Sequence, residues 1–167
     1  MKLGGDRLDD LTHRMRRFAS DLFSYNGVQV RFQAPGGEEN PHVDADIRRQ
    51  VFLIFKESLH NAARHSGCSE VDIRLRLDGG WLELALADNG KGFDLARVRC
   101  GHGLASMAQR AKQLGGALAV DTAPGHGAAL ALRVPVGRSS GASWKRYPHK
   151  WAGYVWRLGR MLRNRAN

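Results

Sequence analysis

Residues 55–65, Phe-Lys-Glu-Ser-Leu-His-Asn-Ala-Ala-Arg-His, and residues 88–94, Asp-Asn-Gly-Lys-Gly-Phe-Asp, decide how this sequence folds. In the first stretch Glu57 and Asn61 are four residues apart, so on a helix both side chains point to the same side. The second stretch places the Asp88 carboxylate directly before two glycines, after an apolar run typical of a strand. We therefore expect the two stretches to face each other across a binding pocket.

The hydrophobic pattern around these stretches predicts three helices and five strands. The helices are expected over residues 6–23, 45–66 and 105–114, because apolar residues recur there at spacings of three and four. The apolar stripe of the first helix must pack either on this domain or on a partner helix. The alternating or apolar runs that predict strands are residues 28–32, 71–77, 81–86, 118–120 and 129–134.

The order of these elements predicts the fold class. Asp78-Gly79-Gly80 joins two of the strands as a tight turn, and residues 122–127 join the last two, so both pairs form hairpins. Hairpins imply a mixed or antiparallel sheet with the helices gathered on one face. The expected fold is therefore α+β, a two-layer α/β sandwich.

Composition and charge limit the classes of protein to which this sequence can belong. A chain of 167 residues suits one domain of ordinary size, and no apolar run approaches the length of a membrane span. Two cysteines are too few for a disulfide framework or a structural zinc site, which favours a cytoplasmic location. Eight of the 26 lysines and arginines, and none of the 16 acidic residues, lie from Gly137 to the end. The body of the chain is nearly neutral, so its charge does not favour nucleic-acid binding.

The glycine segments match neither familiar phosphate-loop pattern. The sequence contains no G-x-x-x-x-G-K-[ST] and no G-x-G-x-x-G between a strand and a helix, which excludes a P-loop enzyme and a dinucleotide-binding domain. What the sequence does contain is E-x-x-x-N on a long helix, D-x-G-x-G after a strand, and then G-x-G-L at residues 101–104. Leu114-Gly115-Gly116 and a strand that ends in Pro135 follow in order.

This ordered set of motifs resembles the Bergerat-fold ATPases of the GHKL superfamily, which includes gyrase-type topoisomerases, heat-shock-90 chaperones and sensor histidine kinases. Within it, the sequence is most similar to bacterial sensor histidine kinases of the nitrate-sensor and desaturase-regulator type. Their pattern E-x-L-x-N-A-x-[KR]-H is matched over residues 57–65, and residues 107–110 and 114–116 also look like that subfamily. The resemblance covers roughly residues 8–136.

The resemblance implies an ATP- and Mg²⁺-binding site. It implies that the Asp88 carboxylate accepts a hydrogen bond from the adenine amine. Gly90 and Gly92 would let the backbone approach the base and the ribose, because glycine has no Cβ. By the same resemblance Asn61 is the metal ligand, and its neutral oxygen suits Mg²⁺, which takes few protein ligands beside phosphate oxygens and waters.

The phosphates are expected near the start of the third helix. Gly101 and Gly103 leave amide donors free there, and the helix dipole also favours anions. Leu104 is the last residue of the G-x-G-L motif at residues 101–104. Arg64 lies three residues after Asn61, on roughly the same face of the helix, and is expected to neutralise phosphate charge. His65 matches a position of the family pattern or simply ends the helix.

The role of Glu57 stays open between a catalytic base and a residue that orients Asn61 or a water. In members of the superfamily that hydrolyse ATP, the matching glutamate activates water, but transfer to a histidine needs no base of this kind because neutral imidazole is already nucleophilic. An anti-sigma-factor-type serine kinase would use Glu57 as base on a serine hydroxyl. A non-catalytic nucleotide-binding regulatory module is the alternative from another class.

The sequence departs from the family pattern in two places. Only seven residues separate Phe93 from Gly101, which predicts a short lid and an open nucleotide site. Ala128 follows Gly125-His126-Gly127, where Thr or Ser is usual, and the missing hydroxyl is expected to reduce affinity.

The phosphoacceptor histidine of such kinases is not evident in this chain. His13 is followed by Arg14 and does not fit the H-[DE] setting. We expect residues 1–25 to be the helix that follows a dimerisation hairpin, residues 26–137 to be the catalytic domain, and the acceptor histidine to lie on a dimerisation domain supplied in cis or in trans. A response regulator is the expected further partner. The expected location is the cytoplasm, where the chain could also be the cytoplasmic part of a membrane-bound sensor.

Residues 138–167 lie outside the resemblance and form a basic tail. Its apolar residues recur at helical spacing, whereas its arginines lie away from this stripe; the stripe is Trp151, Tyr154, Val155, Leu158 and Leu162. A basic amphipathic helix of this kind could contact an anionic membrane or a partner, fold back on the domain, or remain disordered.

Overall fold

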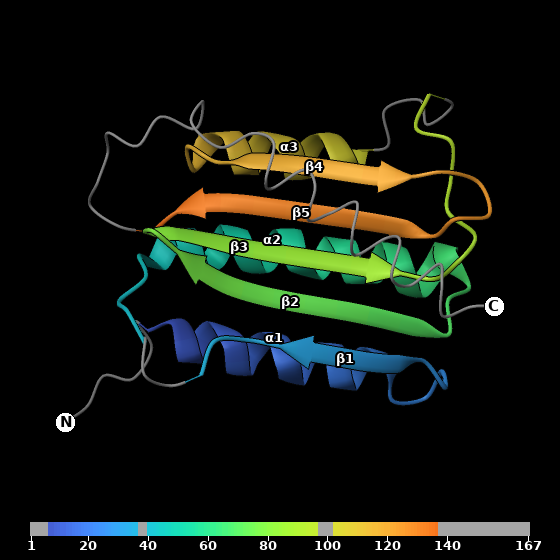
Figure 1. Ribbon diagram of the computed structural model, residues 1–167, viewed down its shortest axis with the longest axis horizontal. Coiled ribbons are helices and arrows are strands. Elements are labelled where there is room, and N and C mark those ends of the chain that lie inside the picture. Colours follow the sequence, from blue (N-terminus) through green and yellow to red (C-terminus); the bar gives the residue numbers. More distant parts are fainter. Residues whose placement is uncertain (1–6, 37–39, 97–101, 137–167) are drawn as a thin grey trace.

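The computed structural model describes residues 7–36, 40–96 and 102–136, which form one mixed sheet with helices packed on one face (Figure 1). The strands are β1 (Gln29–Gln33), β2 (Glu70–Asp78), β3 (Trp81–Asp88), β4 (Ala117–Thr122) and β5 (Ala128–Pro135). The helices are α1 (Leu8–Phe23), α2 (Ala45–Asn61) and α3 (His102–Gln113), and α2 continues as one π-helical segment, η1 (Ala62–Ser66). The predicted two-layer α+β sandwich is confirmed.

The strands are ordered β1-β2-β3-β5-β4, with β1 parallel to β2 and every other neighbouring pair antiparallel. Both predicted hairpins are present, and the first turns through Gly79 and Gly80 at φ values of +55° and +82°. In this register Asp88, the last residue of β3, lies between Val71 on β2 and Ala128 on β5. Asp88 is thus placed at one end of the three central strands.

Helix α1 supplies part of the hydrophobic core. Its stripe is buried against α2 and the sheet; these residues are Leu8, Leu11, Met15, Ala19 and Phe23. Phe18 makes an edge-on ring contact with Phe52 of α2, with 5.8 Å between the ring centroids. The stripe therefore packs on this domain. The origin of α1 as the segment after a dimerisation hairpin stays a prediction.

Helix α2 carries the first of the two decisive stretches and begins at a conventional cap. The Asp44 carboxylate accepts a hydrogen bond from the backbone N–H of Asp46 at 2.8 Å. The helical segment ends at Gly67, whose φ of +62° is left-handed. Among the described helices, none has both the length and the hydropathy of a bilayer span.

Candidate functional site

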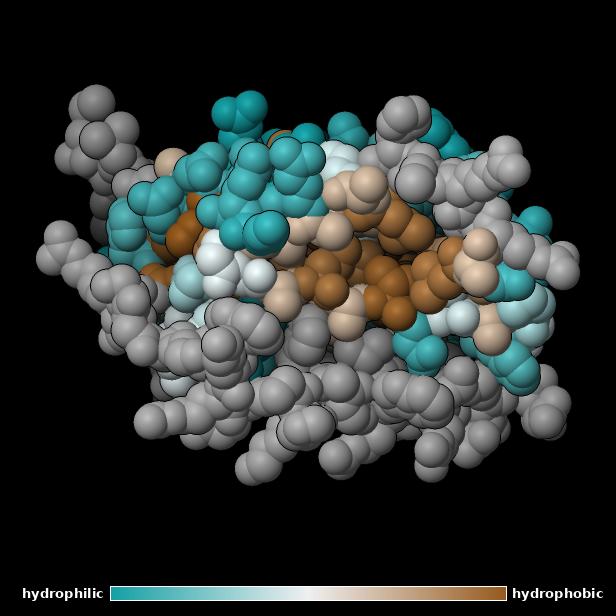
Figure 2. Space-filling model, turned by 90° about the horizontal axis from the view of Figure 1, so that it is seen from above, coloured by the Kyte–Doolittle hydropathy of each residue, from teal (hydrophilic) through white to brown (hydrophobic). Residues whose placement is uncertain are grey.

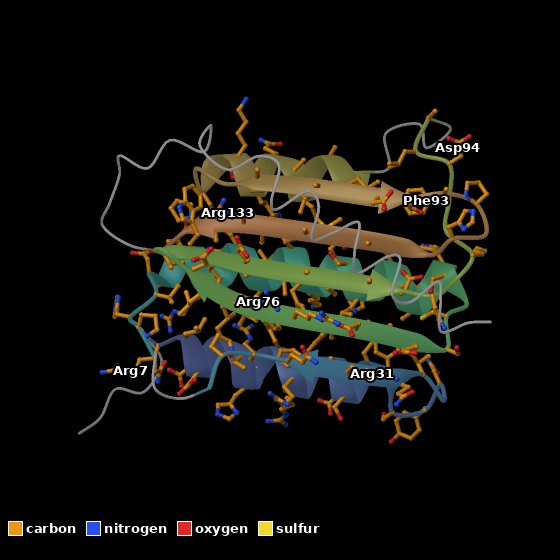
Figure 3. All side chains as sticks on the ribbon, viewed as in Figure 1. Arg7, Arg31, Arg76, Phe93, Asp94 and Arg133 are labelled. Carbon is orange, nitrogen blue, oxygen red and sulfur yellow. The ribbon has the colours of Figure 1, made fainter. Side chains whose placement is uncertain are left out.

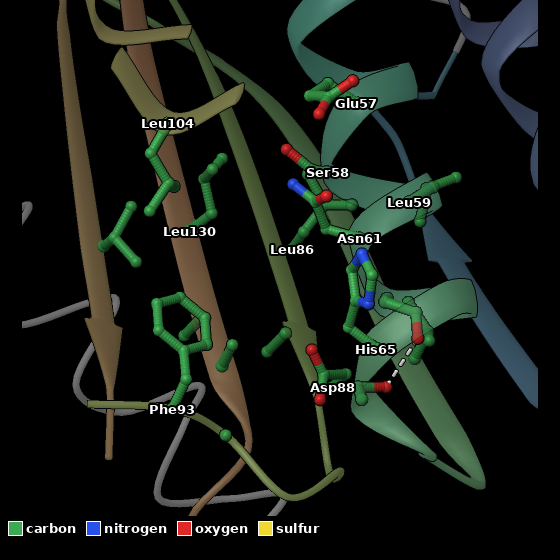
Figure 4. Close-up of a pocket in the computed structure, with 18 of the residues that line it drawn as sticks. Glu57, Ser58, Leu59, Asn61, His65, Leu86, Asp88, Phe93, Leu104 and Leu130 are labelled. Carbon is green, nitrogen blue, oxygen red and sulfur yellow. Dashed lines mark hydrogen bonds between the residues drawn. The ribbon is translucent and has the colours of Figure 1, made fainter. Parts of the chain in front are cut away.

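A cavity of about 400 Å³ lies between α2, α3 and the sheet. Residues of both decisive stretches line it, so they lie on opposite sides of one pocket. Figure 4 shows Glu57, Asn61 and His65 projecting from the helical side, across from Leu86 and Leu130 on the strands. On the side of α3 and β4, hydrophobic surface gathers at the centre, between hydrophilic residues (Figure 2). The pocket thus combines one polar wall with one apolar wall.

Asp88 is the acidic group at the sheet end of the cavity. Its Oδ1 atom accepts a hydrogen bond from the backbone N–H of Gly90 at 2.9 Å. Burial raises the pKa of the Asp88 carboxyl above its ordinary value, although the N–H groups of Gly90 and Ala128 and the Ser66 hydroxyl act in the opposite direction. A half-buried hydrogen-bond acceptor is therefore held at an apolar wall, a setting that suits a flat ring carrying an exocyclic amine.

The loop after Asp88 is fixed to the start of β2. The Asn89 Oδ1 atom accepts hydrogen bonds from the backbone N–H groups of Ser69 and Glu70, at 2.9 and 3.0 Å. The Lys91 N–H donates to the Ser66 carbonyl at 2.8 Å. These bonds hold the loop in place without any ligand. Phe93 follows at the end of the sheet opposite Arg7 (Figure 3).

The two loop glycines are required by the protein's own backbone. A Cβ on Gly90 would overlap the backbone and the Cβ of Ser66, and Gly90 is not among the lining residues. Gly92 has a φ of +59°, and a Cβ there would overlap the carbonyls of Ala123 and Gly127. Gly92 does line the cavity, so its expected role in the approach of a ligand stays a prediction. For Gly90, contact with η1 gives a sufficient reason for glycine.

Thr122 is a site residue that sequence reasoning did not single out. Its Oγ1 atom accepts a hydrogen bond from the Phe93 N–H at 3.0 Å and donates to the Gly127 carbonyl at 2.8 Å. It therefore joins the loop after β3 to the turn before β5. The sequence signal that could have identified Thr122 is strand alternation, which places it on the same face of β4 as Val120. Ala128 lines the cavity beside Asp88, so the hydroxyl expected from the family pattern is missing at the cavity wall.

Glu57 lies at the opposite end of the cavity from Asp88. An ideal Cβ on Gly103 would stand 2.6 Å from the Glu57 Oε1 atom, so the carboxylate occupies the space beside the first turn of α3. This turn is the positive end of the helix dipole, where an anion is stabilised. Leu104 lines the cavity, whereas Gly101 lies outside the described residues.

The π-helical segment determines which residues after Asn61 reach the cavity. Asn61 and His65 line it, but Arg64 is exposed and does not. In a π-helix each residue advances less around the axis than in an α-helix, because the hydrogen bonds run from i to i+5. Arg64 therefore turns away, while His65 and Ser66 return to the cavity side. For this reason Arg64 does not share the Asn61 face as expected, and its expected contact with phosphate stays a prediction.

The side chains that line the cavity could hold a metal ion only together with a bound ligand that supplies further metal ligands. Within the described ranges, no group of three or more His, Cys, Asp or Glu side chains could hold a metal ion. The Asn61 side chain lines the cavity, and its neutral amide oxygen is compatible with Mg²⁺ because Mg²⁺ takes most of its ligands from phosphates and water.

Comparison with known proteins shows the family of this chain. The structure of the Erythrobacter litoralis EL346 blue-light activated histidine kinase matches with a TM-score of 0.64 and 22% identity, covering 75% of this chain and 42% of that one. At this identity the likeness shows the fold alone. The family model described as histidine kinase-, DNA gyrase B-, and HSP90-like ATPase matches residues 46–138, and the chain belongs to this family.

Two curated relatives are bacterial histidine kinases. The signal transduction histidine-protein kinase/phosphatase DegS of Bacillus subtilis is 29% identical over 77% of this chain and 35% of its own length. The sensor histidine kinase LiaS of the same organism is 35% identical over 56% of this chain and 26% of its own length. The chain thus spans about a third or less of the length of these relatives.

Proposed function

We propose that this chain is the catalytic domain of a bacterial two-component sensor histidine kinase of the nitrate-sensor and desaturase-regulator type. It would bind ATP with Mg²⁺ and donate the γ-phosphoryl group to a histidine. The observation that carries the proposal is the half-buried Asp88 carboxylate, held by Gly90 at the wall of an apolar cavity. Membership of the ATPase family and the similarity to DegS and LiaS support it.

In the proposed complex the adenine ring lies against the apolar wall that includes Leu86, Leu104 and Leu130, and its amine donates to Asp88. A cavity of about 400 Å³ is within the range of small-molecule sites, roughly 300–1,000 Å³. Because the loop is already held by Asn89 and Thr122, little ordering would accompany adenine binding.

The phosphates would extend toward the first turn of α3, where Gly103 and the helix dipole favour an anion. Asn61 would hold the Mg²⁺, which neutralises phosphate charge and orients the transferred group. Glu57 would orient Asn61 or a water, or act as a base, and it must yield space near Gly103 because its carboxylate lies there now. His65, which projects from η1 on the Asp88 side of Asn61, would contact the adenine end of the nucleotide (Figure 4).

The acceptor histidine would come from a dimerisation domain, in cis in a longer protein or in trans, and a response regulator would then receive the phosphoryl group. Transfer would form a bond between phosphorus and an imidazole nitrogen and break the bond to the bridging oxygen, leaving ADP.

Calorimetry with a non-hydrolysable ATP analogue tests the pocket, and labelled ATP tests the reaction. Binding should require Asp88 and should tighten with Mg²⁺. Incubated alone with labelled ATP, the chain should acquire no acid-labile phosphohistidine, whereas an added histidine-containing dimerisation domain should become labelled. A label mapped to His13 would contradict the proposed place of the acceptor, and unchanged binding by Asp88→Asn would contradict the pocket itself.

A further inference from the structure

Two serines of the α2–η1 segment line the cavity, and both use their hydroxyl in the same way. The Ser58 hydroxyl donates to the Ile54 carbonyl at 2.8 Å. The Ser66 hydroxyl makes the same kind of bond, to the Ala62 carbonyl at 2.7 Å. Figure 4 shows Ser58 next to Glu57, whereas Ser66 belongs to η1 at the other end of the cavity. The two serines therefore differ in what else surrounds them.

Ser66 is joined to the loop that follows Asp88. Its Oγ atom accepts a hydrogen bond from the Cys68 N–H at 3.1 Å, and its carbonyl accepts one from the Lys91 N–H at 2.8 Å. An ideal Cβ on Gly90 would stand 2.6 Å from the Ser66 Cβ, and the Gly90 N–H itself donates to the Asp88 Oδ1 atom. The Ser66 side chain therefore lies beside the Asp88 carboxylate.

The Ser66 hydroxyl can donate to Asp88 when that carboxyl is ionised. A hydroxyl has one proton and rotates to suit its acceptor. A carboxylate is a stronger acceptor than a neutral carbonyl, so ionised Asp88 competes with Ala62 for this proton. Burial raises the pKa of Asp88, and the Ser66 hydroxyl acts against that rise, as such a bond requires. With 9% of Ser66 exposed, little water competes for the proton.

The π-helical hydrogen bonding of η1 brings Ser66 to this position. In a regular α-helix, at about 100° per residue, residue 66 would lie about 140° around the axis from Asn61. The smaller advance per residue in η1 returns Ser66 toward the side of Asn61, which faces the cavity. Ala128, the neighbour of Asp88 on β5, has no hydroxyl to offer. Ser66 therefore supplies a hydroxyl from the helical side.

We propose that Ser66 is a positioning residue for adenine recognition, because its hydroxyl orients the Asp88 carboxylate. Gly90 holds one carboxylate oxygen through its N–H, and the Ser66 hydroxyl adds a second donor from η1. A carboxylate bonded from two sides cannot rotate freely, so its acceptor oxygen stays aimed at the adenine amine. This inference rests on the proposed binding of ATP, and Ser66 acts in it through Asp88.

Ser66→Ala tests the role, with Ser58→Ala as the matched control. Each variant loses one bond to the carbonyl four residues earlier, and alanine suits a helix, so both should fold. Calorimetry then compares ADP with IDP, the inosine nucleotide that lacks the adenine amine. Ser66→Ala should lose about fivefold of the wild-type preference for ADP, whereas Ser58→Ala should keep it. In the Asp88→Asn background, Ser66→Ala should cause no further loss.

A measurement without nucleotide separates this inference from the proposed function. The difference in unfolding free energy between chains with Asp88 and with Asp88→Asn follows the titration of this carboxyl. With Ser66→Ala, the stabilising contribution of the Asp88 proton should be lost at a higher pH, because the ionised form has lost a donor. The other titratable groups of the surrounding elements are unchanged between these chains; they are His65 of η1, Cys68, Lys91 and His126.

An unchanged preference for ADP in Ser66→Ala would overturn the proposal, as would an equal loss in Ser58→Ala or a loss that persists beside Asp88→Asn. Ser66→Cys is a second variant of similar shape with only a weak donor, and it should behave like Ser66→Ala. A wild-type chain that binds ADP and IDP equally would contradict the proposed function and this role in it. A titration midpoint moved by Ser66→Ala would then still show the hydroxyl acting on Asp88.

Discussion

The two ends of the cavity between the helices and the sheet are built differently. At the Asp88 end the backbone is held by Asn89, Thr122 and the contact of Gly90 with η1, all within the protein. At the Glu57 end, polar side chains of α2 project into the cavity near the first turn of α3. There the carboxylate of Glu57 occupies the space beside Gly103.

This difference indicates how binding free energy is distributed. The Asp88 end is preorganised, so a lost contact there should reduce affinity directly. In the proposed complex the metal and the phosphates would lie at the Glu57 end, so changes there should alter metal dependence and transfer more than base recognition.

The largest effect is expected from Asp88→Asn. Losing a charged acceptor for the adenine amine should weaken ADP binding about 30- to 100-fold, roughly 2–3 kcal/mol. Calorimetry measures this, with Asp121→Asn on the outer side of β4 as the matched control that should leave affinity unchanged. Equal losses in both variants would show that the loss does not come from a contact of Asp88 in the cavity.

Gly90→Ala should destabilise the fold by about 2 kcal/mol, because the new Cβ would overlap Ser66 of η1. Gly36→Ala is the control, since nothing lies within 4 Å of a Cβ at that position. Urea unfolding of both variants measures the free energy of unfolding. A Gly90→Ala variant as stable as Gly36→Ala would mean that the contact with η1 does not set the loop.

Asn61→Ala tests the other end and should act through the metal. We expect about a tenfold loss of affinity for Mg²⁺-ATP, roughly 1.4 kcal/mol, with little change for adenosine, which lacks phosphates. Titrations with and without EDTA separate the two contributions. An equal loss for adenosine would show that Asn61 supports the base instead.

Thr122→Val keeps the shape of the side chain but removes the hydrogen bonds of the hydroxyl. It should cost about 1 kcal/mol of stability and weaken adenosine binding by a smaller factor than Asp88→Asn does. Thermal unfolding and the same calorimetry are the measurements, and unchanged values in both would exclude Thr122 from positioning the loop.

The smallest effect is the pH dependence that follows from the raised pKa of Asp88. The folded chain holds this proton more tightly than the unfolded chain, so the stabilising contribution is full below the unfolded value of 3.8 and is lost as pH rises through the raised pKa. ADP affinity should change in the opposite sense and fall as pH is lowered through that pKa. Comparing urea unfolding of wild type and Asp88→Asn from pH 4 to 7 isolates this group.

The elements of the fold were predictable because their signals are local. Helical spacing, the Gly79-Gly80 turn and strand alternation each follow from a few neighbouring residues. Helix periodicity also predicts that Glu57 and Asn61 point to the same side, as long as the helix is regular. The orientation of Arg64 could not be predicted, because it depends on the π-helical hydrogen bonding of η1.

The role of Gly90 could not be predicted from the sequence for a similar reason. The residue that would collide with its Cβ, Ser66, is distant in sequence and becomes its neighbour only through the sheet register.

The most direct measurement of the central claim compares ADP with the inosine nucleotide IDP, which carries a carbonyl oxygen in place of the adenine amine. If Asp88 reads that amine, the wild-type chain should bind ADP at least about 30-fold more tightly than IDP, and Asp88→Asn should nearly erase the difference. Equal affinity of the wild-type chain for ADP and IDP would contradict the assignment of Asp88 and of the pocket built around it.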